Sequence, residues 1–414
     1  MRRRTLLGVG GAAVPAALTL SSPAVASSSR RWVHTWVAMP QLTEPGNLPP
    51  APFTGAASVL TDTTLRQTVH ITIGGPRVRV RFSNAFGGAA LPITAAALGR
   101  PTDGLAGVPG VVPGSLRPLT FGGRPGVVVP VGAQVVSDPV ALPVHTGENL
   151  SITVYLADGQ ATLNLTSHPG SRTSSWLVKG NLLTAPDLPT ATRADHWYLI
   201  SGVEVLAGAP ALAIVGDSLT DGRGSTTNGN DRWPDQLFAR RQRIAILNQA
   251  AGGNRILNDG LGPSVLARLD RDVLATGGVD RMLLFEGVND IGTAAATPAA
   301  QKQVTDDLLF AFTQIAERAH ARDITVYGAT ITPFGGNTGY DDPDGLREAS
   351  RQFLNREIRR GRIFDEIADF DVAARDPATP RQLNPLYDTG DHLHFNPTGY
   401  AALAAAVPLR WLTP

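Results

Sequence analysis

Two patterns of apolar residues divide the chain near residue 207. From about residue 31 to residue 206, short segments alternate apolar and polar side chains, with glycine- and proline-rich segments between them. In the stretch TVHITIGGPRVRVRF, residues 68 to 82, two alternating runs flank a Gly-Gly pair, which predicts a β-hairpin with one face in water. Short strands with frequent turns predict an antiparallel sandwich or jelly-roll-like domain over residues 31 to 207.

The pattern changes at AGAP, residues 207 to 210. Short apolar runs that predict strands follow at residues 212–215, 244–247, 282–285, 324–331 and 363–370. Stretches with helical spacing lie between them, among them residues 234–241, 263–274 and 298–321. This alternation predicts an α/β domain over residues 211 to 414, with a five-stranded parallel sheet covered by helices on both faces. Because such sheets bind ligands at the carboxyl ends of their strands, the loops there are where chemistry is expected.

The first 26 residues have the features of an export signal. A basic head at residues 2 to 4 precedes an apolar run from about residue 6 to residue 20 and the pattern Ala-Val-Ala at residues 24 to 26. Three arginines followed by Thr-Leu-Leu resemble a twin-arginine signal, with a general secretory signal as the alternative. The mature protein is therefore expected outside the cell, free or associated with the cell wall. No second apolar run of membrane length follows, so no integral membrane segment is expected after the signal is removed.

Composition narrows the function classes. The 36 Lys and Arg residues are interspersed with 35 Asp and Glu residues, for a net charge of +1. The sequence therefore shows no cluster of basic residues of the kind that binds nucleic acid. The chain has no cysteine, which excludes disulfides, thiolate metal sites and a cysteine nucleophile.

Ser218 lies in the loop after the first predicted strand of the α/β domain. A serine is a poor nucleophile unless a neighbouring base, itself oriented by a third group, activates it. This domain contains three histidines, His320, His392 and His394. His320 ends a predicted helix that precedes a strand, which places it at the opposite end of the sheet and favours a structural role. The base is therefore expected in the segment that contains the other two.

Two acid–histidine pairs are available in YDTGDHLHFNPTGY, residues 387 to 400. Asp391 and His394 are three residues apart, so in a turn both side chains project to one side and the carboxylate can accept a hydrogen bond from Nδ1. Asp388 and His392, four apart, form an alternative that spacing alone leaves open. A metal site on the two histidines is disfavoured because the sequence offers no further histidine cluster and no cysteine.

Acyl transfer also requires donors aimed at the developing oxyanion. The loop after the second predicted strand contains Gly252 and Gly253, where a backbone without side chains can bring an N–H close to a ligand. The loop after the third contains GVND, residues 287 to 290, in which Asn289 is a neutral amide donor. Each loop alone is typical of a turn or a helix cap. Together, at successive strand ends on one edge, they favour a site for acyl transfer.

These segments resemble the four sequence blocks of the SGNH hydrolases, also called the GDSL esterase/lipase family, in the family's order. The blocks are GDSL at residues 216 to 219, Gly253, GVND at residues 287 to 290 and DHLH at residues 391 to 394. The resemblance implies a three-layer α/β/α, flavodoxin-like fold and hydrolysis of acyl esters without a metal or other cofactor. The β-rich half, with RVRFSNAFGG at residues 79 to 88, is similar to modules fused ahead of secreted bacterial enzymes of this family.

Carried over position by position, the resemblance makes Ser218 the nucleophile, His394 the general base and Asp391 the acid that orients this base. The oxyanion hole would consist of the Ser218 and Gly253 backbone N–H groups and the Asn289 side chain. Because two glycines adjoin, Gly252 is the alternative donor.

The resulting expectation is a secreted, monomeric serine esterase that acts on small or polymeric acyl esters, with extracellular polysaccharide as one substrate class. A lipase or lysophospholipase-type acylhydrolase is the alternative within the class. A non-catalytic cell-wall or carbohydrate-binding protein is the alternative outside it. The β-rich half is expected either to shape the cleft or merely to pack. Asp217 is expected to cap or bond its loop, and Trp233 either to floor a pocket or to pack in the core.

Overall fold

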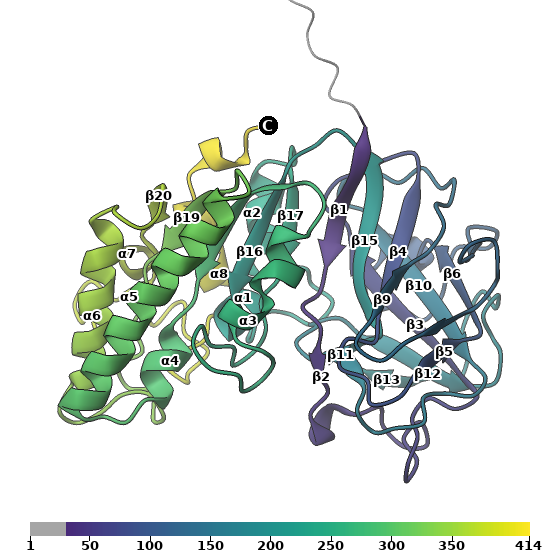
Figure 1. The fold of residues 1–414 in the computed structure, drawn as a ribbon, viewed down its shortest axis with the longest axis horizontal. Coiled ribbons are helices and arrows are strands. Elements are labelled where there is room, and N and C mark those ends of the chain that lie inside the picture. Colours follow the sequence, from purple (N-terminus) through teal and green to yellow (C-terminus); the bar gives the residue numbers. More distant parts are fainter. Residues whose placement is uncertain (1–29) are drawn as a thin grey trace, which may run out of the picture.

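The computed structural model describes residues 30–414, so the predicted export signal lies outside the described residues. Figure 1 shows antiparallel sheets in the N-terminal half beside a parallel sheet with helices in the C-terminal half. Strand β15 (Ile200–Ala207) of the first half leads almost directly into β16 (Ala211–Gly216) of the second. Strand β1 (Arg31–Val37) packs beside β17 (Ala245–Asn248), so the two halves share an interface.

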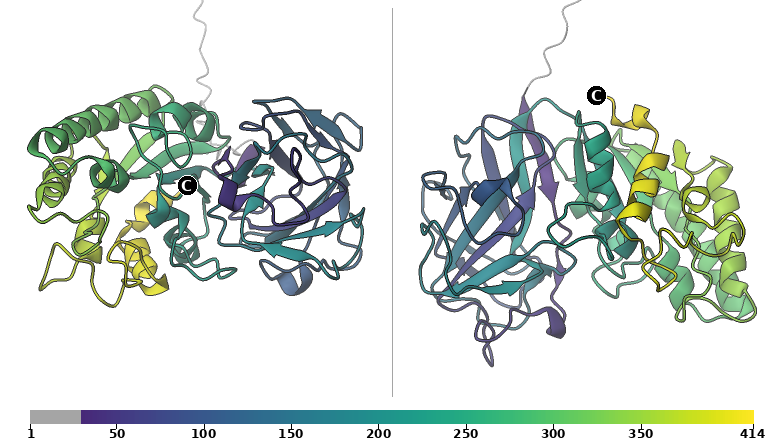
Figure 2. Two further views of the ribbon diagram at one scale, coloured as in Figure 1. Left: turned by 90° about the horizontal axis from the view of Figure 1, so that it is seen from below. Right: turned by 180° about the vertical axis from the view of Figure 1, so that it is seen from behind.

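Two antiparallel sheets make up most of the β-rich half (Figure 2). The four-stranded sheet has the order β1, β15, β4 (Val78–Ser83) and β9 (Gln134–Val136). The six-stranded sheet has the order β13 (Thr192–Ala194), β12 (Ser175–Lys179), β3 (Thr63–His70), β10 (Asn149–Leu156), β6 (Ala95–Gly99) and β7 (Arg117–Leu119). Side chains of both sheets meet in one buried apolar cluster, as in a sandwich.

Short strands complete this half. They are β2 (Gln41–Leu42), β11 (Thr166–His168) and β14 (Trp197–Tyr198) in one small sheet, and β5 (Leu91–Ile93) with β8 (Val127–Val129) in another.

The hairpin predicted over residues 68 to 82 is wrong. Its second strand exists as β4, but its first strand overlaps β3 only at residues 68 to 70, because β3 ends at His70; the alternating apolar residues of both are buried as expected. However, β3 pairs with β10 and β12, whereas β4 pairs with β15 and β9, so the intervening segment crosses from one sheet to the other. The face of β4 predicted to be wet carries Arg79 and Arg81, which instead bind the buried carboxylate of Glu204. Local alternation identified the strands but not their partners, because pairing depends on distant segments.

The C-terminal half contains the predicted five-stranded parallel sheet. Its order is β17, β16, β18 (Val279–Phe285), β19 (Thr325–Ala329) and β20 (Glu366–Ala368), the doubly wound order of flavodoxin-like folds. Strand β20 is shorter than the predicted run because the side chain of Asp369 caps the next helix, accepting a hydrogen bond from Val372 N–H. The carboxyl ends of all five strands point to one edge.

Helices cover both faces of this sheet. One group consists of α2 (Trp233–Arg240), α7 (Phe370–Ala374) and α8 (Pro397–Ala406), which pack on one another. The other consists of α3 (Val265–Leu269), α4 (Val288–Thr293), α5 (Pro298–His320) and α6 (Leu346–Arg359). A π-helical turn, Asp270–Leu274, extends α3, and the four-residue helix α1 (Ser218–Asp221) follows β16. The architecture is therefore a three-layer α/β/α domain preceded by antiparallel β-structure.

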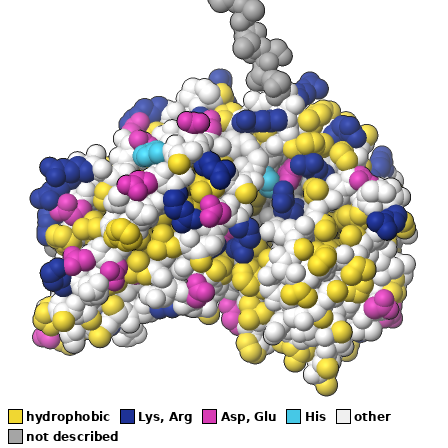
Figure 3. All heavy atoms as spheres, in the orientation of Figure 1, with side chains coloured by type: hydrophobic (Ala, Val, Ile, Leu, Met, Phe, Trp, Pro, Cys, Tyr) yellow, Lys and Arg dark blue, Asp and Glu magenta, His cyan; other side chains and the backbone are white. Residues whose placement is uncertain are grey.

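The surface carries both signs of charge. Basic and acidic side chains lie intermixed across both halves on the face shown in Figure 3. Of the helices within residues 30–414, none combines the length and the apolar character needed to cross a membrane.

Candidate active site

Ser218 is placed by the junction of the central strand β16 with helix α1. The strand ends at Gly216, and the side chain of Asp217 caps α1 by accepting a hydrogen bond from Leu219 N–H at 2.8 Å. Ser218 is the first residue of this helix and is 8% exposed. The predicted capping role of Asp217 is therefore the observed one.

Ser218, His394 and Asp391 form a hydrogen-bonded chain. Ser218 Oγ lies 2.8 Å from His394 Nε2, and His394 Nδ1 lies 2.6 Å from Asp391 Oδ2. The other carboxyl oxygen of Asp391 accepts the backbone N–H groups of Leu393 and His394. Burial of Asp391 acts to raise its pKa, but the hydrogen bonds from His394 outweigh it and lower the pKa to about 2. The carboxylate is therefore ionised whenever the imidazole needs an acceptor.

The environment keeps His394 neutral. Burial lowers the pKa of the imidazole below its ordinary value of 6.5, against the opposing effect of Asp391. A neutral imidazole whose Nδ1 donates to a carboxylate has a free electron pair at Nε2, which faces the hydroxyl of Ser218. The arrangement can remove a proton from Ser218.

The two other histidines of this half lie elsewhere. His392 Nδ1 binds Asp388 Oδ2 at 2.8 Å, and its side chain is 51% exposed. The structure thus contains both acid–histidine pairs that spacing allowed, but only His394 reaches Ser218. His320, at the end of α5, binds Asp365 at 2.9 Å, next to the amino end of β20, which is the opposite end of the sheet, as predicted.

The loop after β17 presents Gly253 to the site. Its φ of +70° is the left-handed conformation that glycine adopts without strain, and a Cβ there would lie 2.5 Å from Leu261 Cδ1. The N–H of the preceding Gly252 donates to Asp221 Oδ2 at 3.0 Å. Within residues 30–414, no hydrogen-bond acceptor faces the N–H of Gly253 or that of Ser218. The two glycines therefore differ: one anchors the loop, and the other has a free donor.

Asn289, at the start of α4, is held in place from two sides. Its Nδ2 donates to the carbonyl of Asn254 at 2.8 Å, and its Oδ1 accepts the hydroxyl of Tyr340 at 2.6 Å. The amide orientation is thereby fixed, and one N–H of Nδ2 remains for a ligand. Tyr340 was not identified from the sequence, because it lies in a loop between β19 and α6 that carries no motif.

Carboxyl groups are buried beneath this site. Burial raises the pKa of Asp217 to about 7, with Asp290 and Asp221 adding to the effect. Burial likewise raises the pKa of Glu286 well above its ordinary value, and neither of its carboxyl oxygens has a hydrogen-bond partner within residues 30–414. Asp290 accepts the backbone N–H groups of Ile256 and Leu257, which ties the loop after β17 to α4.

Trp233 does not floor a pocket. Its side chain is fully buried, packs edge-on against Phe370 and donates from Nε1 to Thr220 Oγ1 at 3.2 Å. Of the two predicted roles, the core role is the observed one. The described residues also include no group of three or more His, Asp or Glu side chains placed to hold a metal ion.

A cavity of ≈ 440 Å³ opens in front of Ser218, and both halves of the chain line it. The α/β half contributes Ser218, Asp221, Arg223, Gly252, Gly253, Leu261, Asn289, Tyr340, Leu393 and His394. The β-rich half contributes Gln41, Glu44, Asn47, Pro169, Gly170, Arg172 and His196. No motif marked this second wall, which arises only when the loops of the β-rich half pack against the α/β half.

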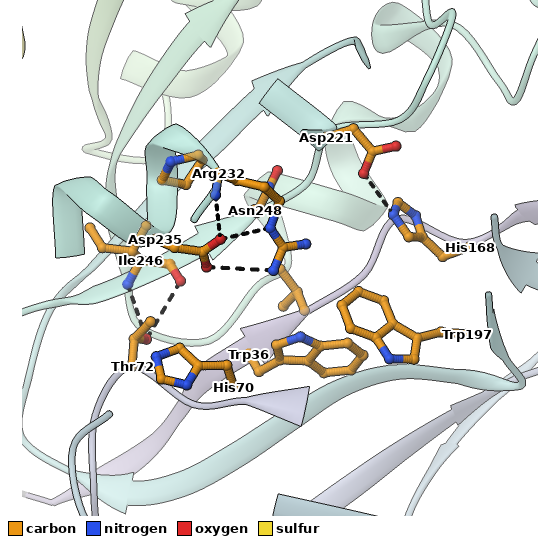
Figure 4. A pocket seen from close by; sticks show the side chains of 12 residues that line it. Trp36, His70, Thr72, His168, Trp197, Asp221, Arg232, Asp235, Ile246 and Asn248 are labelled. Atoms are coloured by element: carbon orange, nitrogen blue, oxygen red, sulfur yellow. Dashed lines mark hydrogen bonds and ion pairs between the residues drawn. The ribbon is translucent and has the colours of Figure 1, made fainter. Parts of the chain in front are cut away.

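A buried histidine–carboxylate contact joins the two halves of the chain in a pocket next to this cavity (Figure 4). His168, the last residue of β11, binds Asp221 Oδ1 through Nε2 at 2.9 Å, and its Nδ1 donates to the carbonyl of Met39. The second carboxyl oxygen of Asp221 accepts a hydrogen bond from Gly252 N–H. A Cβ on Gly170 would lie 1.7 Å from that oxygen, so glycine is required for the close approach. The β-rich half therefore contacts the loop that contains Gly253 through one intervening carboxylate.

The hydrogen-bonded serine, histidine and aspartate, at the carboxyl edge of a parallel sheet, form an arrangement that can activate a serine hydroxyl for attack on an ester. Comparison with protein families is more specific: a model of the GDSL-like lipase/acylhydrolase family matches residues 214–402. This segment is a GDSL-like lipase/acylhydrolase domain, and the protein is a carboxylic ester hydrolase.

Solved structures resemble this domain over about half of the present chain. One is a putative lipolytic protein of the G-D-S-L family from Desulfitobacterium hafniense, with 18% identity, covering 47% of this chain and 96% of that chain at a TM-score of 0.36. Another is a putative acylhydrolase from Bacteroides fragilis, with 19% identity, 48% and 86% coverage and a TM-score of 0.34. A third is an acetylxylan esterase from Geobacillus stearothermophilus, with 18% identity, 49% and 93% coverage and a TM-score of 0.36. No curated protein matches the sequence.

Proposed function

We propose that this protein is a secreted serine esterase that removes acyl groups from extracellular polysaccharide, with Ser218, His394 and Asp391 as its catalytic triad. The observation that carries the proposal is the continuous hydrogen-bonded chain from Ser218 Oγ through His394 to Asp391, at 2.8 Å and 2.6 Å. A domain that had lost its activity would have no need to keep these hydrogen bonds.

In the proposed reaction, Ser218 Oγ attacks the ester carbonyl while His394 Nε2 takes its proton. The negative charge that develops on the carbonyl oxygen is stabilised by the N–H groups of Ser218, Gly253 and Asn289. His394 then protonates the leaving alcohol, and the acyl group stays on Ser218. Water, deprotonated by the same imidazole, hydrolyses the acyl-enzyme and regenerates the serine. Asp391 remains ionised throughout and stabilises the imidazolium.

The polar lining of the cavity supports a sugar as the alcohol portion of the substrate ester. The wall contributed by the β-rich half is mostly polar, with Gln41, Glu44, Asn47, Arg172 and His196. Such groups recognise hydroxyl-bearing substrates by hydrogen bonds, whereas a long acyl chain is bound by a mainly apolar pocket. Export outside the cell, expected from the first 26 residues, would bring the enzyme to such polymers.

The catalytic assignment is tested by hydrolysis of p-nitrophenyl acetate. We expect Ser218→Ala to lower kcat by about 10³- to 10⁶-fold, because triad members act as a unit. Ser225→Ala is a matched control, since this serine lies in the loop just after α1 and bonds the carbonyl of Gly222. If Ser218→Ala retains most of the activity, the catalytic assignment is wrong.

The substrate class is tested with p-nitrophenyl esters from acetyl to palmitoyl, run beside acetylated xylan with acetate release as the readout. We expect short acyl chains and the polysaccharide to be preferred. A preference for palmitate would instead support a lipase.

Secretion is tested by expressing the full chain and a chain lacking residues 1 to 26, with esterase activity expected in the medium only for the full chain.

A further inference from the structure

Two arginine side chains line the cavity without forming an ion pair, the half-buried Arg172 and the exposed Arg223. Arg172 lies in the loop between β11 and β12, and Arg223 follows α1, so they come from different halves of the chain. Neither guanidinium forms a hydrogen bond or ion pair with another side chain of residues 30–414, and Arg172 Nε is buried without any hydrogen-bond partner there. Leaving a buried charged donor unsatisfied is costly. A partner from outside the chain is therefore expected.

The carboxylates of the cavity bond to other groups in this structure. Glu44 accepts Gln41 Nε2 at 2.6 Å and Asn47 Nδ2 at 2.9 Å. Asp221 is occupied by His168 and by Gly252 N–H, at 2.9 Å and 3.0 Å. Neither acid contacts Arg172 or Arg223, so within residues 30–414 both guanidiniums remain without an ion-pair partner.

The loop that carries Arg172 is fixed in position. Its carbonyl accepts the backbone N–H of Asn228 at 2.8 Å, and Asn228 Oδ1 accepts Ser174 N–H at 2.8 Å. Arg172 itself has a φ of +49°, which few non-glycine residues adopt. The backbone that carries Arg172 is thus held at the cavity by contacts between the two halves.

Both arginines act on the histidine side of the site. Their positive charges disfavour the protonated form of His394 and contribute to the lowering of its pKa. The imidazole delivers a proton to the leaving alcohol, so the alcohol lies on this side, opposite the oxyanion donors. An anionic group on the alcohol would form ion pairs with the guanidiniums. Their positive charges would then no longer destabilise the protonated form of His394.

From this geometry we infer that the enzyme selects esters whose alcohol portion carries a carboxylate or a phosphate, bound between Arg172 and Arg223. The inference rests on the proposed function and makes it more specific, because it adds a charge requirement to the ester. Guanidinium groups bind both kinds of oxyanion through paired N–H donors. A uronic acid in a polysaccharide and a phosphorylated sugar or glycerol are the two sources of such an anion.

The test compares matched pairs of small acetyl esters by initial rates of acetate release. One pair is an acetylated methyl glucuronoside with its free carboxylate and the corresponding neutral uronamide, and the other is acetylated glucose 6-phosphate and acetylated glucose. For the wild type we expect kcat/KM to be about 10- to 100-fold higher for at least one anionic member than for its neutral partner, the range for charge-assisted hydrogen bonds. The larger ratio identifies the source of the anion. Increasing salt should reduce it.

Variants assign the preference to the arginines. Arg172→Gln and Arg223→Gln should each reduce the anionic-to-neutral ratio by about tenfold, and Arg172→Lys should retain part of it, since the charge is kept. Arg117→Gln, in an exposed arginine of β7 outside the cavity, is the control and should leave the ratio unchanged.

Two results overturn the inference in distinguishable ways. If the wild type hydrolyses neutral and anionic members equally, and this hydrolysis is lost in Ser218→Ala, the charge requirement is wrong while the esterase assignment stands. If no acetyl ester is hydrolysed in a Ser218-dependent manner, both proposals fail.

Discussion

The two halves of the molecule reach the same cavity by different structural routes. The α/β half places Ser218, Gly253 and Asn289 directly after β16, β17 and β18, three neighbouring strands of one parallel sheet. The β-rich half reaches the cavity with loops, such as that between β11 and β12, whose positions depend on packing against the other half. The proposed reacting groups therefore lie at one edge of a sheet, and groups suited to recognising the substrate lie partly on the neighbouring module.

The largest effect is expected within the α/β half, at the choice between two histidines. His394→Ala should lower kcat by about 10³-fold or more, because Ser218 loses its base. His392→Ala should lower it by less than about tenfold, since this exposed side chain binds Asp388 and does not reach Ser218. Steady-state hydrolysis of p-nitrophenyl acetate measures both. The reverse ranking would move the base to His392.

A smaller loss is expected at the oxyanion donors. Asn289→Ala should cost about 10²- to 10³-fold in kcat with little change in KM, the usual consequence of removing one such donor. Tyr340→Phe removes the hydroxyl that orients this amide, and should cost about tenfold. If Tyr340→Phe changed KM alone, Tyr340 would contact the substrate rather than position Asn289.

Some residues of the site could be predicted from the sequence, whereas others could be identified only from the structure. Ser218, Asn289 and the pair of Asp391 with His394 follow from strand-end positions and motifs, because parallel strands bring successive loops to one edge. The ambiguity between Gly252 and Gly253 needed the structure, which shows that the first donates to Asp221. Tyr340, His168 and Arg172 carry no local signal, since their placement depends on contacts between residues far apart in the chain. The same limit explains the wrong hairpin, in which both strands were identified and paired incorrectly.

The buried acid beside the nucleophile predicts a pH-dependent stability. Because the pKa of Asp217 is about 7 in the folded state and 3.8 is its ordinary value, the folded carboxyl stays protonated where the unfolded one ionises. The free energy of unfolding therefore falls as pH rises from about 4 to about 7, and this group adds no further loss above that range.

Asp217→Asn should remove this loss, because a neutral amide can still cap α1. Between about pH 5 and about pH 8, the wild type should lose about 2 to 3 kcal/mol more than the variant. Urea unfolding at both pH values measures the difference. Equal pH dependence in the two proteins would show that Asp217 is ionised in the folded state.

An effect no larger than that of Tyr340→Phe is expected from the β-rich half, and it decides whether that half only packs. His168→Ala removes the contact that steadies Asp221 and hence the Gly252 N–H, and should lower kcat by about tenfold with KM nearly unchanged. Gly170→Ala, which forces the pair apart, should act in the same direction. His145→Ala, at an exposed histidine outside the interface, is the matched control. A normal kcat in both interface variants would indicate that the β-rich half only packs against the α/β half.

The most direct test of the account is covalent trapping of the nucleophile. The full chain is treated with an organophosphonate ester and digested, and the labelled peptide is identified by mass spectrometry. We expect a single label on Ser218, formed rapidly in the wild type and about 10³-fold more slowly in His394→Ala, because only the activated hydroxyl reacts. Failure of the wild type to label, or a label on another serine, would contradict the assignment of Ser218 as the nucleophile of this esterase.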